Sequence, residues 1–123
     1  MPTEESFLKN RLKAVSYAAK GFWLLVSSES SIKVQIVISI IMTILGFIMK
    51  ISATEWMFQL LAIGLVLVAE SLNTAIERMA DFIHPDFNKK IGIIKDISAG
   101  AAFFAAIFAI IIGLIIYVPK IIS

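Results

Sequence analysis

The fold of this chain is decided by an uncharged stretch, WMFQLLAIGLVLVA at residues 56–69, that runs directly into Glu70. A helix from Trp56 to Glu77 is about 31 Å long, close to the thickness of the hydrocarbon core of a bilayer. On that helix Glu70 lies about 10 Å inside the edge marked by Glu77. An ionisable side chain at such a depth is costly, and it predicts a functional site.

The composition is typical of a membrane protein. Of the 123 residues, 59% are hydrophobic, and the mean hydropathy of +0.94 is far above that of a soluble domain. We therefore expect an all-α membrane protein with three transmembrane helices and an N-terminal amphipathic surface helix. The expected segments of this single membrane domain, 1–123, are a surface helix at 7–27 and spans at 32–51, 55–82 and 96–118.

The basic residues predict how the chain is oriented. Nine of the eleven Lys and Arg residues lie before the first span or near the loop at 82–94, and only Lys50 and Lys120 lie on the other side. Cytoplasmic loops carry the excess of Lys and Arg. We therefore expect the N-terminus and the 82–94 loop to face the cytoplasm.

Residues 7–27 have the pattern of a helix that lies in the membrane interface. Apolar residues recur at helical spacing, and Lys9, Lys13 and Lys20 line the opposite face. The helix is either an anchor alone or a lid over a cytoplasmic site, where a lysine or Tyr17 contacts an anionic ligand. The serines at 27–31 are expected to end this helix and to cap the next one.

Polar residues gather on one face of the middle span. Glu70, Asn73 and Glu77 fall within an arc of about 60° on a helix, and Asp81 extends the same face. Glu29 is expected at the same depth as Glu77. The third span opens with Lys95-Asp96, which we expect near a helix N-terminus, where anions are attracted and Asp96 could serve as the N-cap.

These residues allow phosphoryl transfer. Glu29, Glu77 and Asp81 offer hard oxygen ligands, and Mg²⁺ is typically held by one or two carboxylates together with substrate phosphates. Asn73 can donate to a phosphate oxygen, and Lys95 can neutralise its charge. Glu70 lies deeper and could act as a general base on an alcohol that arrives from the membrane. Glycine-rich nucleotide motifs are absent, so an ATP site has to be built from helices.

Two other functions remain open at this point. A small proton-coupled transporter also uses intramembrane carboxylates, and Glu70 would be its proton carrier. A non-enzymatic helix-bundle subunit would use the polar residues to bind helix to helix. The spacing of the residues alone does not distinguish a kinase from a transporter. We expect no nucleic-acid partner.

The string ESLNTAIE at 70–77, with Asp81 and Lys95-Asp96, resembles the bacterial diacylglycerol kinase and undecaprenol kinase family. The segments 52–56 and 63–70 are similar to the undecaprenol kinase branch. The resemblance implies a homotrimer in the bacterial inner membrane, with sites between protomers. It also implies phosphorylation of a membrane lipid alcohol, either diacylglycerol or undecaprenol, with ATP as donor and Mg²⁺ as cofactor.

The resemblance also implies roles for individual residues. Glu70 would be the catalytic base, and Glu29 and Glu77 would bind the Mg²⁺ that carries ATP. The implied ATP contacts are Tyr17, Asn73, Glu77, Lys95 and Asp96. Further contacts to substrate or phosphate would come from Lys13, Lys20 and Asp81.

Overall fold

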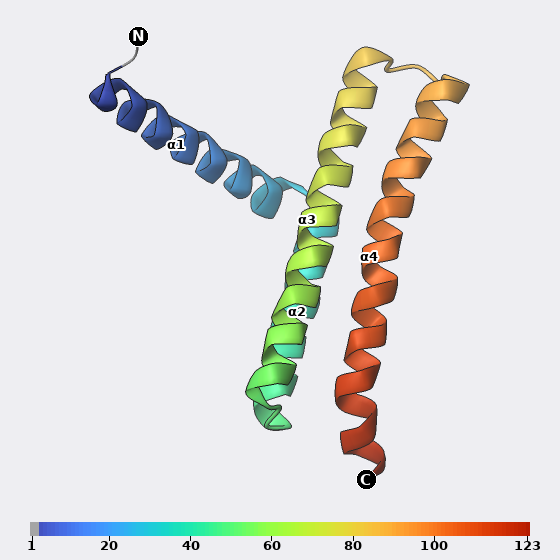
Figure 1. Ribbon diagram of the computed structural model, residues 1–123. Helices are drawn as coiled ribbons and strands as arrows, with labels where there is room; N and C mark the ends of the chain where they lie inside the picture. Colours follow the sequence, from blue (N-terminus) through green and yellow to red (C-terminus); the bar gives the residue numbers. More distant parts are fainter. Residues whose placement is uncertain (1–2) are drawn as a thin grey trace.

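The computed structural model describes residues 3–123, and its secondary structure in that range is helical. The four helices, in chain order, are α1 (Glu4–Ser28), α2 (Ser30–Ile48), α3 (Ala53–Ile83) and α4 (Lys89–Ile122). The last three run alternately up and down as an antiparallel bundle, and α1 points away from it (Figure 1). The prediction of three long helices preceded by a separate N-terminal helix is confirmed.

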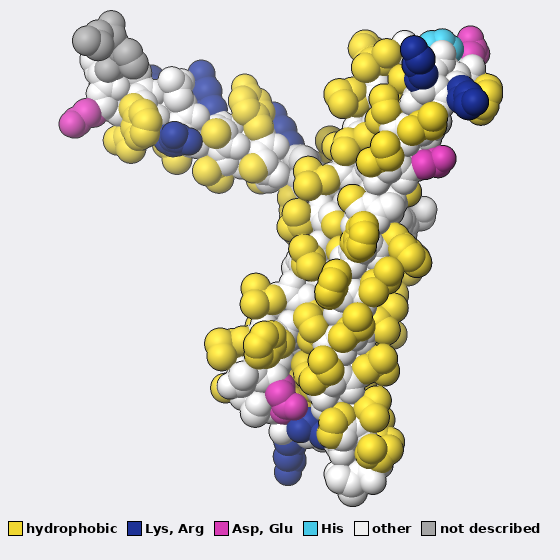
Figure 2. Space-filling view, turned by 45° about the vertical axis from the view of Figure 1, so that its right-hand side comes forward, with side chains coloured by type: hydrophobic (Ala, Val, Ile, Leu, Met, Phe, Trp, Pro, Cys, Tyr) yellow, Lys and Arg dark blue, Asp and Glu magenta, His cyan; other side chains and the backbone are white. Residues whose placement is uncertain are grey.

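Each of α2, α3 and α4 is long and apolar enough to cross a membrane. Large apolar side chains are exposed along the whole bundle, and they cover most of the face seen in Figure 2. Soluble proteins rarely expose apolar surface on this scale. The chain is therefore a multi-pass membrane protein.

The bundle has two distinct ends. At one end, which we call the α1 end, lie α1 and the loop between α3 and α4; at the other, the C-terminal end, lie the turn between α2 and α3 and the C-terminus (Figure 1). Most basic side chains of α1 lie along the upper edge of this helix in Figure 2, and most of its apolar side chains lie along the lower edge. That arrangement suits a helix that lies along a lipid surface.

The junction between α1 and α2 differs from the prediction. Glu29, not a serine, is the N-cap residue of α2, and its side chain makes no capping hydrogen bond. Ser27 instead donates to the carbonyl oxygen of Trp23 at 2.6 Å, and Ser28 donates to that of Leu24. Serine hydroxyls that bond back to the preceding turn are not available to cap the next helix.

Helix α3 is continuous for 31 residues, and both of its ends are well defined. Ser52 and Glu55 form a reciprocal capping box, with the Glu55 carboxylate accepting from the Ser52 amide at 2.8 Å. At the other end Pro85 disfavours a helical conformation of His84, and the helix ends at Ile83. All of the acidic positions between 70 and 81 therefore lie on one unbroken helix.

Helix α4 begins earlier than the sequence predicted. The expected loop covered 82–94, but the helix starts at Lys89, so Lys95 and Asp96 lie inside it and Asp96 is not its N-cap. The cap is Asn88, whose side-chain oxygen accepts from the amides of Lys90 at 2.9 Å and Ile91 at 3.2 Å. This cap satisfies the free amides of the first turn, so the helix can begin there.

A cluster of buried apolar residues lies at the C-terminal end of the bundle. Ile51, Ile116 and Tyr117 are buried there, with Trp56 packed against them. An ion pair between Lys120 and Glu55, at 3.1 Å, joins α4 to α3 at the same end. At this end side chains from all three spans are in contact.

Candidate functional site

The polar face of α3 lies toward the α1 end. Glu70, Asn73 and Glu77 are half-buried, and Asp81 is exposed. Since α3 is an unbroken helix, the spacing of these residues keeps them on one side of it. The structure thus brings together the four positions of α3 that the sequence singled out.

Glu29 reaches α3, where it forms an ion pair. Its carboxylate accepts a hydrogen bond from the guanidinium of Arg78, the neighbour of Glu77 in the chain. Among residues 3–123 no three His, Cys, Asp or Glu side chains come close enough together to hold a metal ion by themselves. The sequence analysis did not single out Arg78. The available signal was the position of this basic residue beside the acidic face of α3, directly after Glu77.

Lys95 joins the polar face from α4. Its ammonium group donates to the Asp81 carboxylate at 2.8 Å, and this ion pair is partly exposed. Asp96 is exposed on the same helix. The structure therefore places the ammonium group of Lys95 against the polar face of α3, where it adds a positive charge near the acidic residues.

The candidate residues of α1 lie apart from this face. Lys13, Tyr17 and Lys20 are exposed, and the Lys20 ammonium group lies 5.7 Å from the centre of the Tyr17 ring. Tyr17 is twelve residues from Glu29, about 18 Å along a helix that points away from the bundle (Figure 1). Within one chain these side chains do not reach the acidic face.

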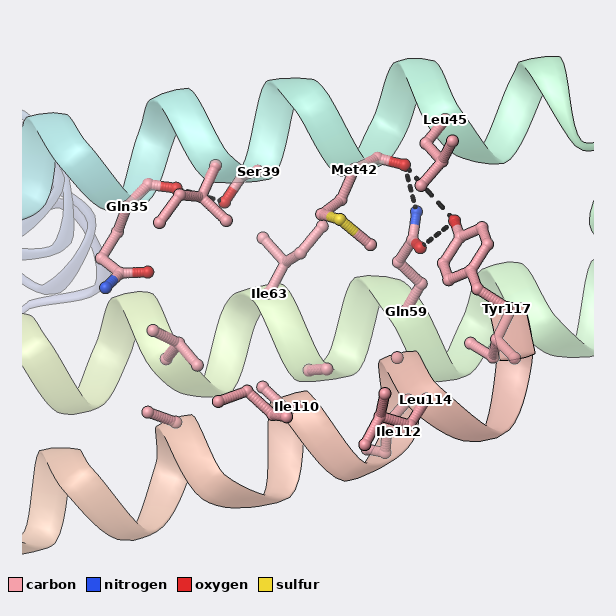
Figure 3. Close-up of a pocket in the computed structure, with 17 residues that line it drawn as sticks. Gln35, Ser39, Met42, Leu45, Gln59, Ile63, Ile110, Ile112, Leu114 and Tyr117 are labelled. Carbon is pink, nitrogen blue, oxygen red and sulfur yellow. Dashed lines mark hydrogen bonds between the residues drawn. The ribbon is translucent and has the colours of Figure 1, made fainter. Parts of the chain in front are cut away.

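A pocket of about 460 Å³ lies between α2, α3 and α4, and we call it the three-helix pocket (Figure 3). Its walls are mainly aliphatic, and its polar side chains are those of Gln35, Ser39, Gln59 and Tyr117. Helix α3 contributes a row of residues that ends at Val66. Glu70 follows four residues later, one helical turn beyond the pocket on the same side of α3.

A hydrogen-bond network closes the pocket toward the C-terminal end. The Tyr117 hydroxyl donates to the side-chain oxygen of Gln59, and the Gln59 amide donates to the carbonyl oxygen of Met42 at 3.0 Å (Figure 3). Gln59 and Tyr117 are 4% and 5% exposed, so this network is buried among apolar side chains. Sequence reasoning missed it; the only signal was a glutamine within an otherwise apolar stretch.

The fold and the site define a helical membrane protein with a charged site at one end and an apolar pocket that approaches it from within the membrane. A comparison with known families then identifies the family: residues 16–117 match the model for prokaryotic diacylglycerol kinase. The chain belongs to this family. It is a lipid kinase, and as a kinase it uses ATP.

Individual relatives agree with this result. The chain is 34% identical to the undecaprenol kinase of Bacillus subtilis (strain 168) over 113 residues, 92% of each chain. It is 26% identical to the diacylglycerol kinase of Escherichia coli (strain K12) over 81% of this chain and 82% of that one. The diacylglycerol kinase of Helicobacter pylori (strain J99) is 24% identical over 88% and 84%. Of the three functions that the sequence left open, these findings favour the kinase.

Proposed function

We propose that this protein transfers the γ-phosphoryl group of ATP to the hydroxyl group of a membrane lipid alcohol at the polar face of α3. The observation that carries the proposal is the position of Glu70, one helical turn beyond the apolar pocket and on the same side of the helix. A hydrocarbon chain in the pocket would place its hydroxyl end beside this carboxylate. The nucleotide would approach from the α1 end.

Glu70 is the general base in this proposal. The oxygen of the lipid alcohol attacks the γ-phosphorus, the bond between that phosphorus and the β–γ bridging oxygen breaks, and ADP leaves. The hydroxyl proton passes to Glu70. Phosphoryl transfer depends mainly on positioning and on charge stabilisation, so one base and a set of fixed polar groups suffice.

The remaining polar residues hold the nucleotide. Asn73 and Lys95 contact its phosphates, and Tyr17 and Asp96 contact the rest of the molecule. The carboxylates of Glu29 and Glu77 fit Mg²⁺, which prefers a few hard oxygen ligands and takes the others from phosphates and water. When bound, the metal ion neutralises phosphate charge. The proposed further contacts to phosphate or lipid are Lys13, Lys20 and Asp81.

The working form is proposed to be a homotrimer. Because Tyr17 and Lys20 do not reach the acidic face of their own chain, α1 of a neighbouring protomer would supply them, which places each site between protomers. The N-terminus and the loop between α3 and α4 would face the cytoplasm, as the positions of the basic residues favour. The surface helix would occupy 7–27, and the membrane spans 32–51, 55–82 and 96–118.

Undecaprenol is the first lipid candidate and diacylglycerol is the second. The higher identity to an undecaprenol kinase, 34% against 26% for a diacylglycerol kinase, supports that order. The aliphatic pocket itself favours neither, because apolar contacts discriminate weakly between hydrocarbon chains.

The test is a phosphorylation assay in mixed micelles. Purified protein is incubated with Mg²⁺, γ-labelled ATP and either undecaprenol or a diacylglycerol, and the lipid is extracted. Label in the extracted lipid is the expected result, with more in undecaprenol. Hydrolysis of ATP without a labelled lipid would contradict the proposal.

Mixing two inactive variants tests the shared site. A protein with Tyr17→Ala and Lys20→Ala lacks the α1 contacts, and Glu70→Gln lacks the base. If sites lie between protomers, trimers assembled from both variants contain some sites with an intact α1 and an intact base, and activity returns. Mixed trimers with no activity would contradict a site shared between protomers.

A further inference from the structure

A second pocket lies along the contact between α3 and α4, toward the α1 end. This seam pocket has a volume of about 400 Å³ and is lined by apolar residues of both helices, apart from Asn73 and Ser98. The side-chain oxygens of these two residues are buried, and neither has a hydrogen-bond partner within residues 3–123. Two unpaired polar atoms thus face the same apolar pocket from opposite helices.

Ser98 differs from several other helical serines in this chain, and it is the one serine of residues 3–123 that is buried. Ser27, Ser39 and Ser71 each donate to the carbonyl oxygen four residues earlier, which is the usual way for a serine in a helix to satisfy its hydroxyl group. Ser98 makes no such bond, although it is only 7% exposed. Its hydroxyl group is therefore available to a partner in the seam pocket.

Asn73 lies where the seam pocket meets the polar face of α3. It lines the pocket, whereas Glu70 does not. On the helix Asn73 is displaced from Glu70 by about 60°, toward α4. An amide at this position can accept a hydrogen bond on the pocket side and donate one on the side of the acidic residues.

We propose that Ser98 is a positioning residue for Asn73. The Ser98 hydroxyl donates to Asn73 Oδ1 through one buried water, and this bridge turns the Asn73 amide so that Nδ2 donates to a phosphate of ATP. The seam pocket has room for such a water between the two polar atoms. Ser98 itself contacts neither substrate. The inference rests on the proposed function, in which Asn73 binds phosphate.

The direct test is Ser98→Ala, assayed with ATP and lipid varied separately. Loss of the donor leaves Asn73 Oδ1 unpaired and its amide free to turn, so kcat/KM for ATP should fall about tenfold while KM for the lipid stays unchanged. Ser98→Thr keeps the hydroxyl group and should restore most of the activity. A change in lipid KM alone, or Ser98→Thr as impaired as Ser98→Ala, would overturn the proposal.

The matched control is Ser71→Ala. Ser71 is also a helical serine, but its hydroxyl group already donates to the Leu67 carbonyl oxygen at 2.7 Å. Its removal should leave the kinetics for ATP unchanged. If Ser98→Ala does not fold in micelles, Ser98→Cys keeps the shape of the side chain, slightly enlarged, with a much weaker donor and should also lower kcat/KM for ATP.

A double-mutant cycle separates this inference from the proposed function. If Ser98 acts through Asn73, then Ser98→Ala should cause no further loss in an Asn73→Ala background. Additive losses would overturn the positioning role. If Asn73→Ala impairs the use of ATP and Ser98→Ala does not, only the positioning role fails. If Asn73→Ala itself leaves the kinetics for ATP unchanged, the phosphate contact fails and the inference fails with it.

Discussion

Arg78 donates from its guanidinium group to the carboxylate of Glu29, and this ion pair ties the junction of α1 and α2 to α3. The same Glu29 carboxylate is a proposed ligand of Mg²⁺. A carboxylate paired with a guanidinium has less charge to offer a metal ion, so under this proposal Arg78 and Mg²⁺ would compete for Glu29. The pair is partly exposed, and a competition of modest size is expected.

The substitution Arg78→Gln should therefore lower the Mg²⁺ concentration needed for half-maximal activity, by about threefold. A titration of kinase activity against Mg²⁺ at fixed ATP measures the change. Lys120→Gln is the matched control, because it removes the cation of the Lys120–Glu55 ion pair at the opposite end of the bundle. An unchanged or higher Mg²⁺ requirement in Arg78→Gln would show that the two cations do not compete.

The proposed metal ligands make the opposite prediction. Glu29→Ala or Glu77→Ala should raise the Mg²⁺ requirement by about tenfold or more, because each removes one of the few protein oxygens that hold the ion. The same titration measures it. Glu5→Ala changes an exposed acid in the first turn of α1 and serves as the control. A titration curve of either variant that overlays that of the control would exclude the altered residue as a ligand.

Glu70→Gln should reduce lipid phosphorylation by about 10²-fold to 10⁴-fold while the protein still folds and assembles. The change keeps the size of the side chain and removes its ability to take a proton. Folding is checked by circular dichroism and size exclusion in micelles. Glu55→Gln, on the same helix at the C-terminal end, should remain active because an amide oxygen can still cap Ser52. Full activity of Glu70→Gln would remove Glu70 from the role of base.

The arrangement of the acidic residues on α3 could be predicted from sequence because it depends on one helix alone. The helix runs unbroken from the capping box at Ser52 to the residues before Pro85, so its period fixes which residues share a face. The start of α4 was predicted wrongly because the residue that caps it was not recognised. Its cap is Asn88, whose side-chain oxygen accepts a local hydrogen bond from the Lys90 amide, and this bond outweighed the polar character of the segment that follows.

The three-helix pocket could not be predicted because it depends on how three helices meet. Gln59 and Tyr117 are 58 residues apart in the chain, and no periodicity in either segment indicates that they form a hydrogen bond. The Glu29–Arg78 ion pair could not be predicted for the same reason, since it depends on where the α1–α2 junction meets α3. Contacts between distant segments were the part of the site that sequence reasoning missed.

Tyr117→Phe should destabilise the bundle by about 1 kcal/mol, because it leaves the buried side-chain oxygen of Gln59 without its donor. Unfolding by added SDS in mixed micelles measures the change. Tyr17→Phe is the control for stability, since that phenol is exposed on α1. A Tyr117→Phe protein as stable as the wild type would mean that the network does not hold the three spans together.

Gly113→Leu tests whether the three-helix pocket receives the lipid. Gly113 lines the pocket, and a Cβ atom added there meets open space, so a leucine should fill the pocket without disturbing the helix backbone. We expect KM for the lipid to rise about tenfold, with KM for ATP unchanged, because only the hydrocarbon chain is displaced. Gly100→Leu is the matched control, since Gly100 has equal space on α4 but does not line the pocket. Equal lipid KM values in the two variants would mean that the alcohol reaches Glu70 by another path.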